Sequence, residues 1–329
     1  MRETVQLASH PRDAPAVSVI IPCYRQARFL GDAIESVQRQ EGYRAAEVVV
    51  VDDGSPDDAA AVAARHPWVR YHRQPNRGVN AARNAGLRLT TGELVVFLDA
   101  DDVLLPHALA TNMRHHVEHA GLAFVSGQMQ RVDVELRPIE GWRPRPHVQE
   151  NHLRQLLVDN DRTYPCATMY RRAVIDDVGG WDEATHFATD WELNLRVARR
   201  APIVLHDEVI ALYRQHPESK MHNPAGMLRS VITLLRRELR SVRGDPALEA
   251  AARLGMHRVR AWYGEALFER ARAHARERRL GALARDVALL LRYDPGRIAL
   301  HARRKLALEA RRALGRRAAA AREPVGREP

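Results

Sequence analysis

The sequence predicts an α/β fold in which a doubly wound sheet is followed by a helical C-terminal region. Short apolar runs alternate with amphipathic helical patterns in the first part of the chain, as in proteins built from strand–helix–strand units. The run at residues 94–98 is apolar throughout, which is typical of a strand buried on both faces of a sheet. From residue 224 onward the strand patterns end, and the chain becomes helical and rich in arginine.

The first part of the chain contains four predicted strands that alternate with helices. The first strand is rich in β-branched residues and ends at Pro22, while the second ends in the acidic turn Asp52-Asp53-Gly54. Asn80 is a candidate cap for the third helix, which forms the body of residues 76–87. The predicted strands are 17–22, 47–51, 69–72 and 94–98, and the first two helices are 29–40 and 57–65.

The remaining elements complete the sheet and then form the helical region. The predicted strands are 123–127, 129–133, 167–170, 203–205 and 209–214, and the helices among them are 106–119, 152–158, 171–178 and 190–200. Further helices are predicted at 227–243, 246–276, 280–293 and 297–314. We therefore expect a flexible tail at 1–16, a catalytic domain at 17–223 and a basic helical region at 224–329.

The positive charge is concentrated in the C-terminal third of the chain. The 329 residues carry a net charge of +10, and residues 226–329 hold 25 basic and 11 acidic side chains. A basic helical surface of this kind can contact an anionic membrane, but the favoured interpretation is a helical subdomain that packs on the catalytic domain with its arginines solvated. No nucleic-acid-binding motif accompanies the charge, so no nucleic acid is expected as a partner.

The cysteine content and the hydropathy pattern bear on the compartment of the protein. Two cysteines, Cys23 and Cys166, make no disulfide framework, which favours a reducing compartment. The polar N-terminus does not resemble a signal peptide, and no run approaches the roughly 20 apolar residues of a membrane span. The expected location is the cytoplasm, with peripheral contact at the inner face of the cell membrane as an option.

Three acids within four residues follow the buried strand at 94–98. The carboxylates of Asp99, Asp101 and Asp102 repel one another, and their burial is costly unless a cation lies among them. Mg²⁺ normally binds proteins through one or two carboxylates plus substrate phosphates, and open α/β sheets bind ligands at the carboxyl ends of their strands. The pattern indicates a metal–diphosphate site, and the simpler alternative is a solvated acidic turn.

Five segments, taken in order, resemble one protein family. They are 17–24, 51–55, 76–86, 98–102 and the pair of stretches 179–183 and 189–193. Their order and spacing are similar to those of the family 2 glycosyltransferases, which are inverting, nucleotide-diphospho-sugar-dependent enzymes. The resemblance covers roughly residues 17–220 and implies a GT-A fold, a doubly wound mixed sheet with a Rossmann-like nucleotide-binding half and an acceptor half.

The resemblance implies a set of residues that bind the nucleotide sugar. The base would lie near the backbone of Pro22 and the ring of Tyr24, and Asp53 would accept a hydrogen bond from a pyrimidine N–H. Arg77 and Asn80 would face the diphosphate, and Asp99 would hold the ribose or a metal-bound water. The alternatives are a packing aromatic for Tyr24, a helix cap for Asp53 and a surface arginine for Arg77.

The resemblance also implies the metal ligands and the catalytic base. Asp101 would bridge Mg²⁺ or Mn²⁺ to the diphosphate, with Asp99 and His216 as further candidate ligands. Asp190 would be the general base, and its alternative role is an N-cap of the helix that follows. Thr189 stands where the family commonly has a glutamate, so a neighbouring carboxylate is missing while the aspartate is kept.

The expected function is transfer of a sugar from a nucleotide-diphosphate sugar, most often a UDP-sugar in this family, to a hydroxyl of a glycan or lipid-linked acceptor. Such a hexosyltransferase-type enzyme would serve polysaccharide or cell-envelope synthesis. The alternative is a non-catalytic carbohydrate-binding or scaffold protein of the same fold, recruited through its basic helical tail.

Overall fold

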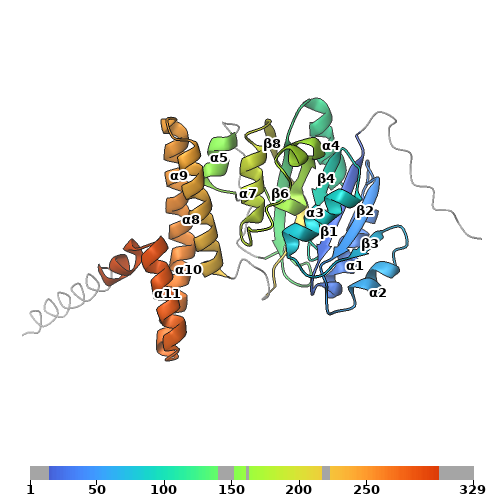
Figure 1. Ribbon diagram of the computed structural model, residues 1–329. Coiled ribbons are helices and arrows are strands. Elements are labelled where there is room, and N and C mark those ends of the chain that lie inside the picture. The colour runs from blue at the N-terminus through green and yellow to red at the C-terminus, as the bar shows by residue number, and fades with distance from the viewer. Residues whose placement is uncertain (1–14, 140–151, 161–162, 217–222, 304–329) are drawn as a thin grey trace, which may run out of the picture. The chain divides into compact units, whose positions relative to one another are not determined.

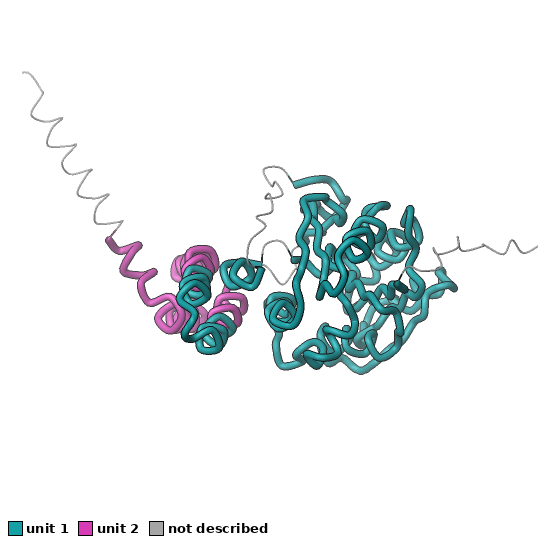
Figure 2. The backbone as a smooth tube through the Cα atoms, turned by 90° about the horizontal axis from the view of Figure 1, so that it is seen from above, with its two compact units in different colours: residues 1–222, 234–255 teal, residues 223–233, 256–329 magenta. Residues whose placement is uncertain are grey.

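The computed structural model describes residues 15–139, 152–160, 163–216 and 223–303 (Figure 1). Most of the predicted tail at 1–16 and the end of the predicted helix 297–314 lie outside these residues. The chain divides into two compact units, one of residues 1–222 and 234–255 and the other of residues 223–233 and 256–329 (Figure 2). The first unit contains the whole sheet.

The sheet of the first unit is mixed, as the sequence predicts. Its order is β3-β2-β1-β4-β7-β6-β8-β5, and β1 to β4 run parallel to their neighbours among themselves, while β7 is antiparallel to both β4 and β6. The strands are β1 Val17–Cys23, β2 Glu47–Asp52, β3 Arg70–Arg73, β4 Leu94–Phe97, β5 Val103–Leu104, β6 Phe124–Val132, β7 Thr168–Arg171 and β8 Ile203–Arg214.

Helices cover both faces of the sheet, so that the strands are buried on both sides. The side chains of Val19 and Ile21 in β1 belong to a core that also contains residues of α1 and α4. On the opposite face, Ile20 packs against Gly86 of α3. The helices of the first unit are α1 Ala27–Gln38, α2 Ala59–Ala64, α3 Val79–Leu89, α4 Ala108–Glu118, α5 His152–Val158, α6 Arg172–Asp177 and α7 Thr189–Val197.

The strands beyond β4 differ from the prediction in how they are divided. The stretches predicted separately at 123–127 and 129–133 form the single strand β6, which is irregular between Ser126 and Met129. Similarly, 203–205 and 209–214 form the single strand β8. The two-residue strand β5 has no periodicity that its sequence could reveal, and its pairing with β8 defines it.

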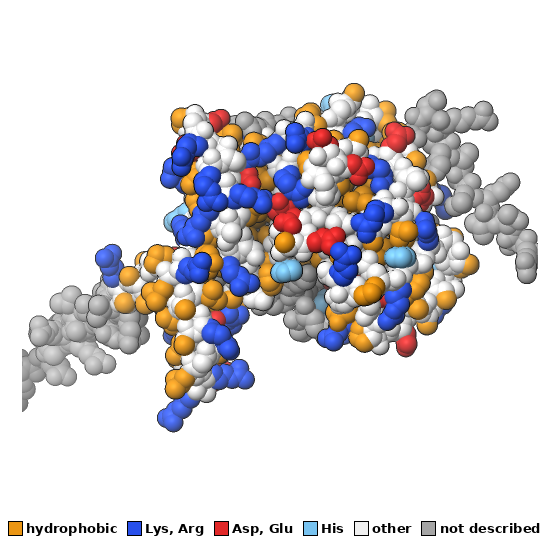
Figure 3. Space-filling model, viewed as in Figure 1, with side chains coloured by type: hydrophobic (Ala, Val, Ile, Leu, Met, Phe, Trp, Pro, Cys, Tyr) orange, Lys and Arg blue, Asp and Glu red, His pale blue; other side chains and the backbone are white. Residues whose placement is uncertain are grey.

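The C-terminal helices follow the predicted pattern closely. They are α8 Pro224–Ser241, α9 Pro246–Val259, α10 Glu265–Arg276 and α11 Leu280–Tyr293, and a π-helical turn at Arg260–Gly264 joins α9 to α10. The second half of α8 and most of α9 belong to the first unit. Basic side chains are spread over these helices (Figure 3), and no described helix is long and apolar enough to cross a membrane.

Candidate active site

The carboxyl ends of β1, β2 and β4 meet at one edge of the sheet. The backbone N–H of Asp53 donates to the carbonyl oxygen of Cys23 at 2.9 Å, and that of Leu98 donates to Ile20 at 3.0 Å. Tyr24 follows β1 with 39% of its surface exposed, whereas Pro22 lies inside the strand rather than at its end. The residues that sequence analysis assigns to the nucleotide therefore start from a common edge.

Asp53 is buried and organises the loop that precedes α3. Its Oδ1 accepts hydrogen bonds from Gln74 Nε2 at 2.8 Å and from the Arg77 N–H at 2.9 Å, and its Oδ2 accepts from the Gly78 N–H at 2.7 Å. A carboxylate offers about four acceptor positions, so one remains for a ligand N–H. The alternative role, a cap of the helix after Asp53, is not seen, because the N-cap of α2 is Asp58 and Asp53 binds the loop before α3 instead.

The neighbouring Asp52 has a purely internal set of partners. It accepts hydrogen bonds from the Ser55 N–H, from the Tyr71 hydroxyl and from Arg73 Nη1. Its side chain is fully buried. This residue therefore stabilises the turn after β2.

The acidic loop, which we define as Asp99 to Asp102, follows β4. Each of its three carboxylates contacts a different partner. Asp99 Oδ1 accepts from Arg83 Nη2 at 2.7 Å, and Asp101 Oδ2 lies 2.9 Å from His216 Nε2. Asp102 accepts from the Arg214 N–H at 3.1 Å. Burial, followed by the charges of Asp101 and Asp99, raises the pKa of Asp102 well above its usual value. A cation near this loop would relieve that repulsion.

Arg83 links the acidic loop to the start of α7. Its side chain is 4% exposed, its Nη1 donates to Thr189 Oγ1 at 3.3 Å, and its guanidinium lies 4.2 Å from the ring centroid of Trp181. Arg83 belongs to the predicted helix within residues 76–87, which also carries Asn80. The structure shows that its charge lies between Asp99 and the segment that carries Asp190.

The last residue of β8, Arg214, contacts the acidic loop. Arg214 is buried, its Nε donates to the Asp101 carbonyl oxygen at 2.9 Å, and its Nη2 donates to Asp32 Oδ2 at 2.6 Å. These bonds position His216, two residues further on, against Asp101. The pairing of Arg214 with Asp32 joins residues far apart in the chain, so no local sequence pattern predicts it.

The donor atoms at the acidic loop suit a divalent metal in part. Asp101 and His216 are adjacent and offer a carboxylate oxygen and an imidazole nitrogen, whereas Asp99 is occupied by Arg83. Two protein donors match the habit of Mg²⁺ of binding through few carboxylates and the phosphates of a substrate. In the described part of the chain, the sets of three potential ligands whose donor atoms lie within 4.8 Å of one another are elsewhere, around His115.

Asp190 lies in the first turn of α7 rather than at its cap, because the helix begins at Thr189 and its N-cap is Ala188. Its Oδ2 accepts a hydrogen bond from Asn160 Nδ2 at 2.8 Å. Burial raises the pKa of Asp190, Arg83 opposes that rise, and Asp99 adds to it. Asp190 and Asp99 are therefore close enough to interact. Asn160 was missed by sequence reasoning, because nothing in its local sequence marks it.

The segment before α7 is docked on α3. Asn80 Nδ2 donates to the carbonyl oxygens of Asp182 at 2.7 Å and Thr185 at 3.0 Å, and Asn84 Nδ2 donates to that of Trp181 at 2.9 Å. Asn80 is thus not the cap of α3, which is preceded by Gly78 as N-cap. Its amide reaches across to the loop instead, because a side chain in the first turn of a helix points outward to its neighbours.

Arg77 forms an ion pair with Glu183 at 2.8 Å, and its side chain is 60% exposed. In this arrangement it lies at the surface beside the loop that precedes α7. Three buried polar atoms near it, Asn80 Oδ1, Arg83 Nε and Trp181 Nε1, have no hydrogen-bond partner among the described residues. Such unsatisfied atoms are uncommon in native proteins and suit a region that binds water or a polar ligand.

The architecture is the GT-A fold, a mixed α/β sheet with helices on both faces. Residues 18–179 match the family model described as Glycosyl transferase family 2.

Individual proteins resemble the chain at modest identity. An uncharacterized glycosyltransferase of Bacillus subtilis, EpsJ, is 28% identical over 64% of this chain and 64% of its own length. The crystal structure of S. aureus TarS residues 1–349 has a TM-score of 0.58 at 20% identity and covers 75% of this chain and 72% of that one. A mannosyltransferase from Pyrobaculum calidifontis, PcManGT, has a TM-score of 0.57 at 20% identity, over 89% and 85%. The chain spans less than two thirds of the length of each of the first curated relatives that it matches.

Proposed function

We propose that this protein is an inverting glycosyltransferase that moves a hexose-type sugar from a nucleotide-diphosphate sugar to a hydroxyl of a glycan or lipid-linked acceptor. The observation that carries the proposal is the presence of a half-buried carboxylate, that of Asp190, at the start of α7 near the acidic loop after β4. Arg83 contacts both segments, through Asp99 and Thr189. The match of residues 18–179 to the family model described as Glycosyl transferase family 2 supports the same reaction class.

The donor is a nucleotide sugar, for which a UDP-sugar is our first choice. Tyr24 offers an exposed ring for stacking on the base, and Asp53 retains one acceptor position for a ring N–H. TarS forms complexes with UDP and with UDP-GlcNAc, and PcManGT one with GDP-Man and Mn²⁺. These neighbours support a nucleotide sugar and a divalent metal for this chain.

Asp101 and His216, with Asp99 as a third candidate, would hold Mg²⁺ or Mn²⁺, and a bound ion would stabilise the charge that grows on the leaving diphosphate. Asp190 receives the proton of the acceptor hydroxyl as that oxygen attacks the anomeric carbon and the carbon–diphosphate bond breaks. Asn160 orients Asp190 by donating a hydrogen bond from its amide to Oδ2. Attack opposite the leaving group inverts the anomeric centre.

The decisive experiment compares Asp190→Asn with Asp182→Asn in a transfer assay with a panel of nucleotide sugars and Mn²⁺. Loss of the general base should lower kcat by roughly 10²–10⁴ while nucleotide binding is kept. Asp182 is the matched control, because its carboxylate accepts bonds from the Ala184 N–H and Thr185 Oγ1 within its own turn. Full transfer by a folded Asp190→Asn variant would remove the proposed base, and nucleotide binding without transfer by the wild type would point to a binding protein.

The acceptor is proposed to be lipid-linked, with the basic helical region at 224–329 in peripheral contact with an anionic membrane. Residues 226–329 hold 25 basic and 11 acidic side chains, and Trp262, Leu280 and Leu291 are 68%, 71% and 58% exposed. Exposed apolar and basic side chains on helices favour an anionic bilayer surface. Cosedimentation with anionic vesicles at low salt, lost at high salt and absent with neutral vesicles, is the expected result. Equal recovery with neutral vesicles would contradict it.

A further inference from the structure

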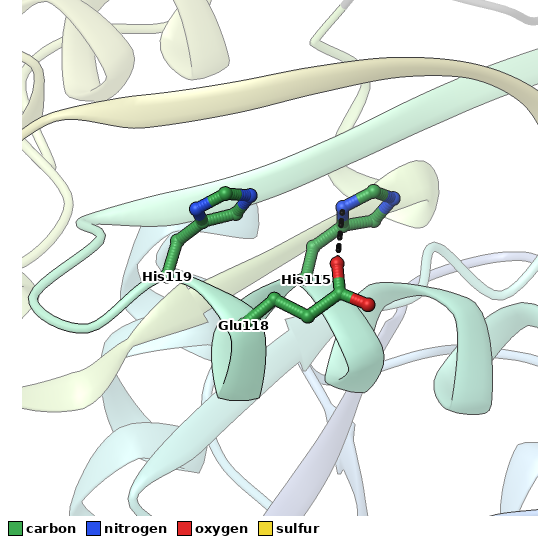
Figure 4. A group of neighbouring side chains, drawn as sticks. All are labelled: His115, Glu118 and His119. Carbon is green, nitrogen blue, oxygen red and sulfur yellow. Dashed lines mark ion pairs between the residues drawn. The ribbon is translucent and has the colours of Figure 1, made fainter.

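A cluster of potential metal ligands lies at the end of α4, outside the acidic loop. His115, Glu118 and His119 each offer one donor atom, and these atoms lie within 4.8 Å of one another. Figure 4 shows the three side chains together at the last turn of the helix, where His115 Nδ1 lies 3.8 Å from Glu118 Oε2. The spacing places residues three and four positions apart on one side of a helix, so the cluster follows from local geometry.

The ring of His115 lacks the partners that a buried imidazole normally has. Both of its nitrogens are shielded from solvent and have no hydrogen-bond partner among the described residues. The neighbouring His206 is different, because its Nε2 faces Asn112 Oδ1 at 2.9 Å and its Nδ1 accepts the Glu208 N–H at 3.3 Å. An unsatisfied buried polar atom in a folded protein calls for a bound water or ion.

The surroundings of the cluster favour a cation. Glu118 contributes a negative charge, and Arg114, the nearby positive charge, is paired with Glu208 at 2.6 Å. His119 is the C-cap of α4, and the C-terminal end of a helix dipole attracts positive charge.

We propose that His115, Glu118 and His119 form a binding site for a borderline divalent transition-metal ion of the Zn²⁺ class. Two imidazole nitrogens and one carboxylate oxygen are donors that such ions accept, whereas Mg²⁺ prefers oxygen ligands alone. Glu118 and His119 are exposed, so the fourth position is open to water. The ion would connect the last turn of α4 to its C-cap. This site shares no residue with the acidic loop.

The test is a titration of ZnCl₂ into the full-length, chelator-treated protein, followed by calorimetry and by thermal melting. It uses an Asp101→Asn background, so that the acidic loop does not compete for the ion. One equivalent should bind, and Glu118→Gln and His119→Ala should each weaken binding at least tenfold, in the range measured for ligand and supporting residues of metal sites. Both side chains are exposed, so both variants are expected to fold.

His66→Ala is the matched control, since it removes an imidazole outside the cluster and should leave the affinity unchanged. Wild-type affinity in the His119→Ala variant would overturn the proposal. The proposal would also be overturned if His206→Asn abolished binding while Glu118→Gln left it unchanged. That pattern would assign the ion to His115, His206 and Glu208. None of these outcomes depends on glycosyl transfer, so the result stands whether or not the proposed function is correct.

Discussion

At the scale of the residue, Arg83 is the side chain on which the charges of the candidate site converge. It is buried, it donates to Asp99 and Thr189, and its guanidinium packs on the ring of Trp181. Its positive charge offsets the rise in the pKa of Asp190 that burial and Asp99 produce. The protonation state of the proposed base therefore depends on a residue that is itself neither base nor metal ligand.

A pH profile tests this role of Arg83. Asp190 must be deprotonated to act, and its raised pKa places the acid limb of kcat/KM above the ordinary range of an aspartate. Arg83→Gln removes the charge that lowers this pKa, so the acid limb should move to higher pH. Arg83→Lys keeps the charge and should leave the limb close to its wild-type position. A profile of Arg83→Gln that coincides with the wild type, in a variant with an unchanged melting temperature, would refute the coupling.

A second residue-scale prediction concerns His116, which is buried on the face of α4 that points away from solvent. Its Nε2 lies 3.0 Å from the Met169 carbonyl oxygen, and burial lowers its pKa from 6.5 to about 4. The unfolded chain then binds the extra proton, so His116 contributes stability that is present above pH 6.5 and is lost as the pH falls toward 4. Between pH 7 and pH 5 this residue alone should remove about 1–2 kcal/mol of unfolding free energy.

Chemical denaturation at both pH values measures the loss at His116. His116→Gln keeps a donor for the Met169 carbonyl and cannot titrate, so its stability should change less between the two pH values. An equal pH dependence in wild type and variant would show that other groups are responsible.

At the scale of the element, the close packing of α3 on β1 positions Arg83 and Asn80. A Cβ added at Gly86 would lie 2.3 Å from Ile20 Cγ2, and Ile20 is fully buried. The helix can approach the sheet this closely only because residue 86 has no side chain. The loop before α7 is in turn hydrogen-bonded to α3 through Asn80 and Asn84, so the position of the helix affects the position of this loop.

Two glycine substitutions separate packing from helix propensity. Gly86→Ala should destabilise the protein by about 1–3 kcal/mol, because the added methyl group overpacks the contact with Ile20. Gly31→Ala in α1 is the matched control, where the nearest atom is Val62 Cγ1 at 3.9 Å, and it should stabilise by about 0.5–1 kcal/mol. Urea denaturation measures both changes, and a Gly86→Ala variant as stable as the wild type would contradict the packing argument.

At the scale of the whole molecule, helices beyond the sheet contribute to the first unit. Glu192 in α7 is almost fully buried and pairs with Arg196 and with Arg237 of α8, both at 2.7–2.8 Å. Glu238 of α8 pairs with Arg199. Gly255 of α9 approaches α5 so closely that a Cβ there would lie 2.1 Å from the Leu157 carbonyl oxygen. These contacts attach residues 234–255 to the sheet-containing unit.

Truncation tests the contribution of these helices. A chain that ends at residue 255 keeps the partners of Glu192 and Arg199, whereas one that ends at 222 loses Arg237 and Glu238. Leaving a buried carboxylate with fewer partners costs about 1–3 kcal/mol, so the shorter chain should melt several degrees lower, at roughly 2–4 °C per kcal/mol. Equal melting temperatures for the two chains would mean that α8 and α9 do not stabilise this unit.

The strands and helices up to β4 were predictable, because each is marked by a local pattern. Apolar runs at 17–22, 47–51 and 94–98 identify buried strands, and helical periodicity identifies α8 to α11 within a few residues. The short strand β5 was not predictable, since two residues carry no period. The prediction of two separate strands in each of the ranges 123–133 and 203–214 was also wrong. β6 and β8 stay paired, irregularly, across the residues where the strand pattern of the sequence is interrupted.

The sequence by itself determined the order of strands and helices, the mixed α/β class and the acidic loop after β4, because these follow from hydrophobic period and from residues adjacent in the chain. Only the tertiary structure decided the partners of those acids. Arg83 with Asp99, His216 with Asp101 and Asn160 with Asp190 join residues 16 to 115 positions apart. Such contacts depend on how helices pack on the sheet, and local sequence patterns do not predict that packing.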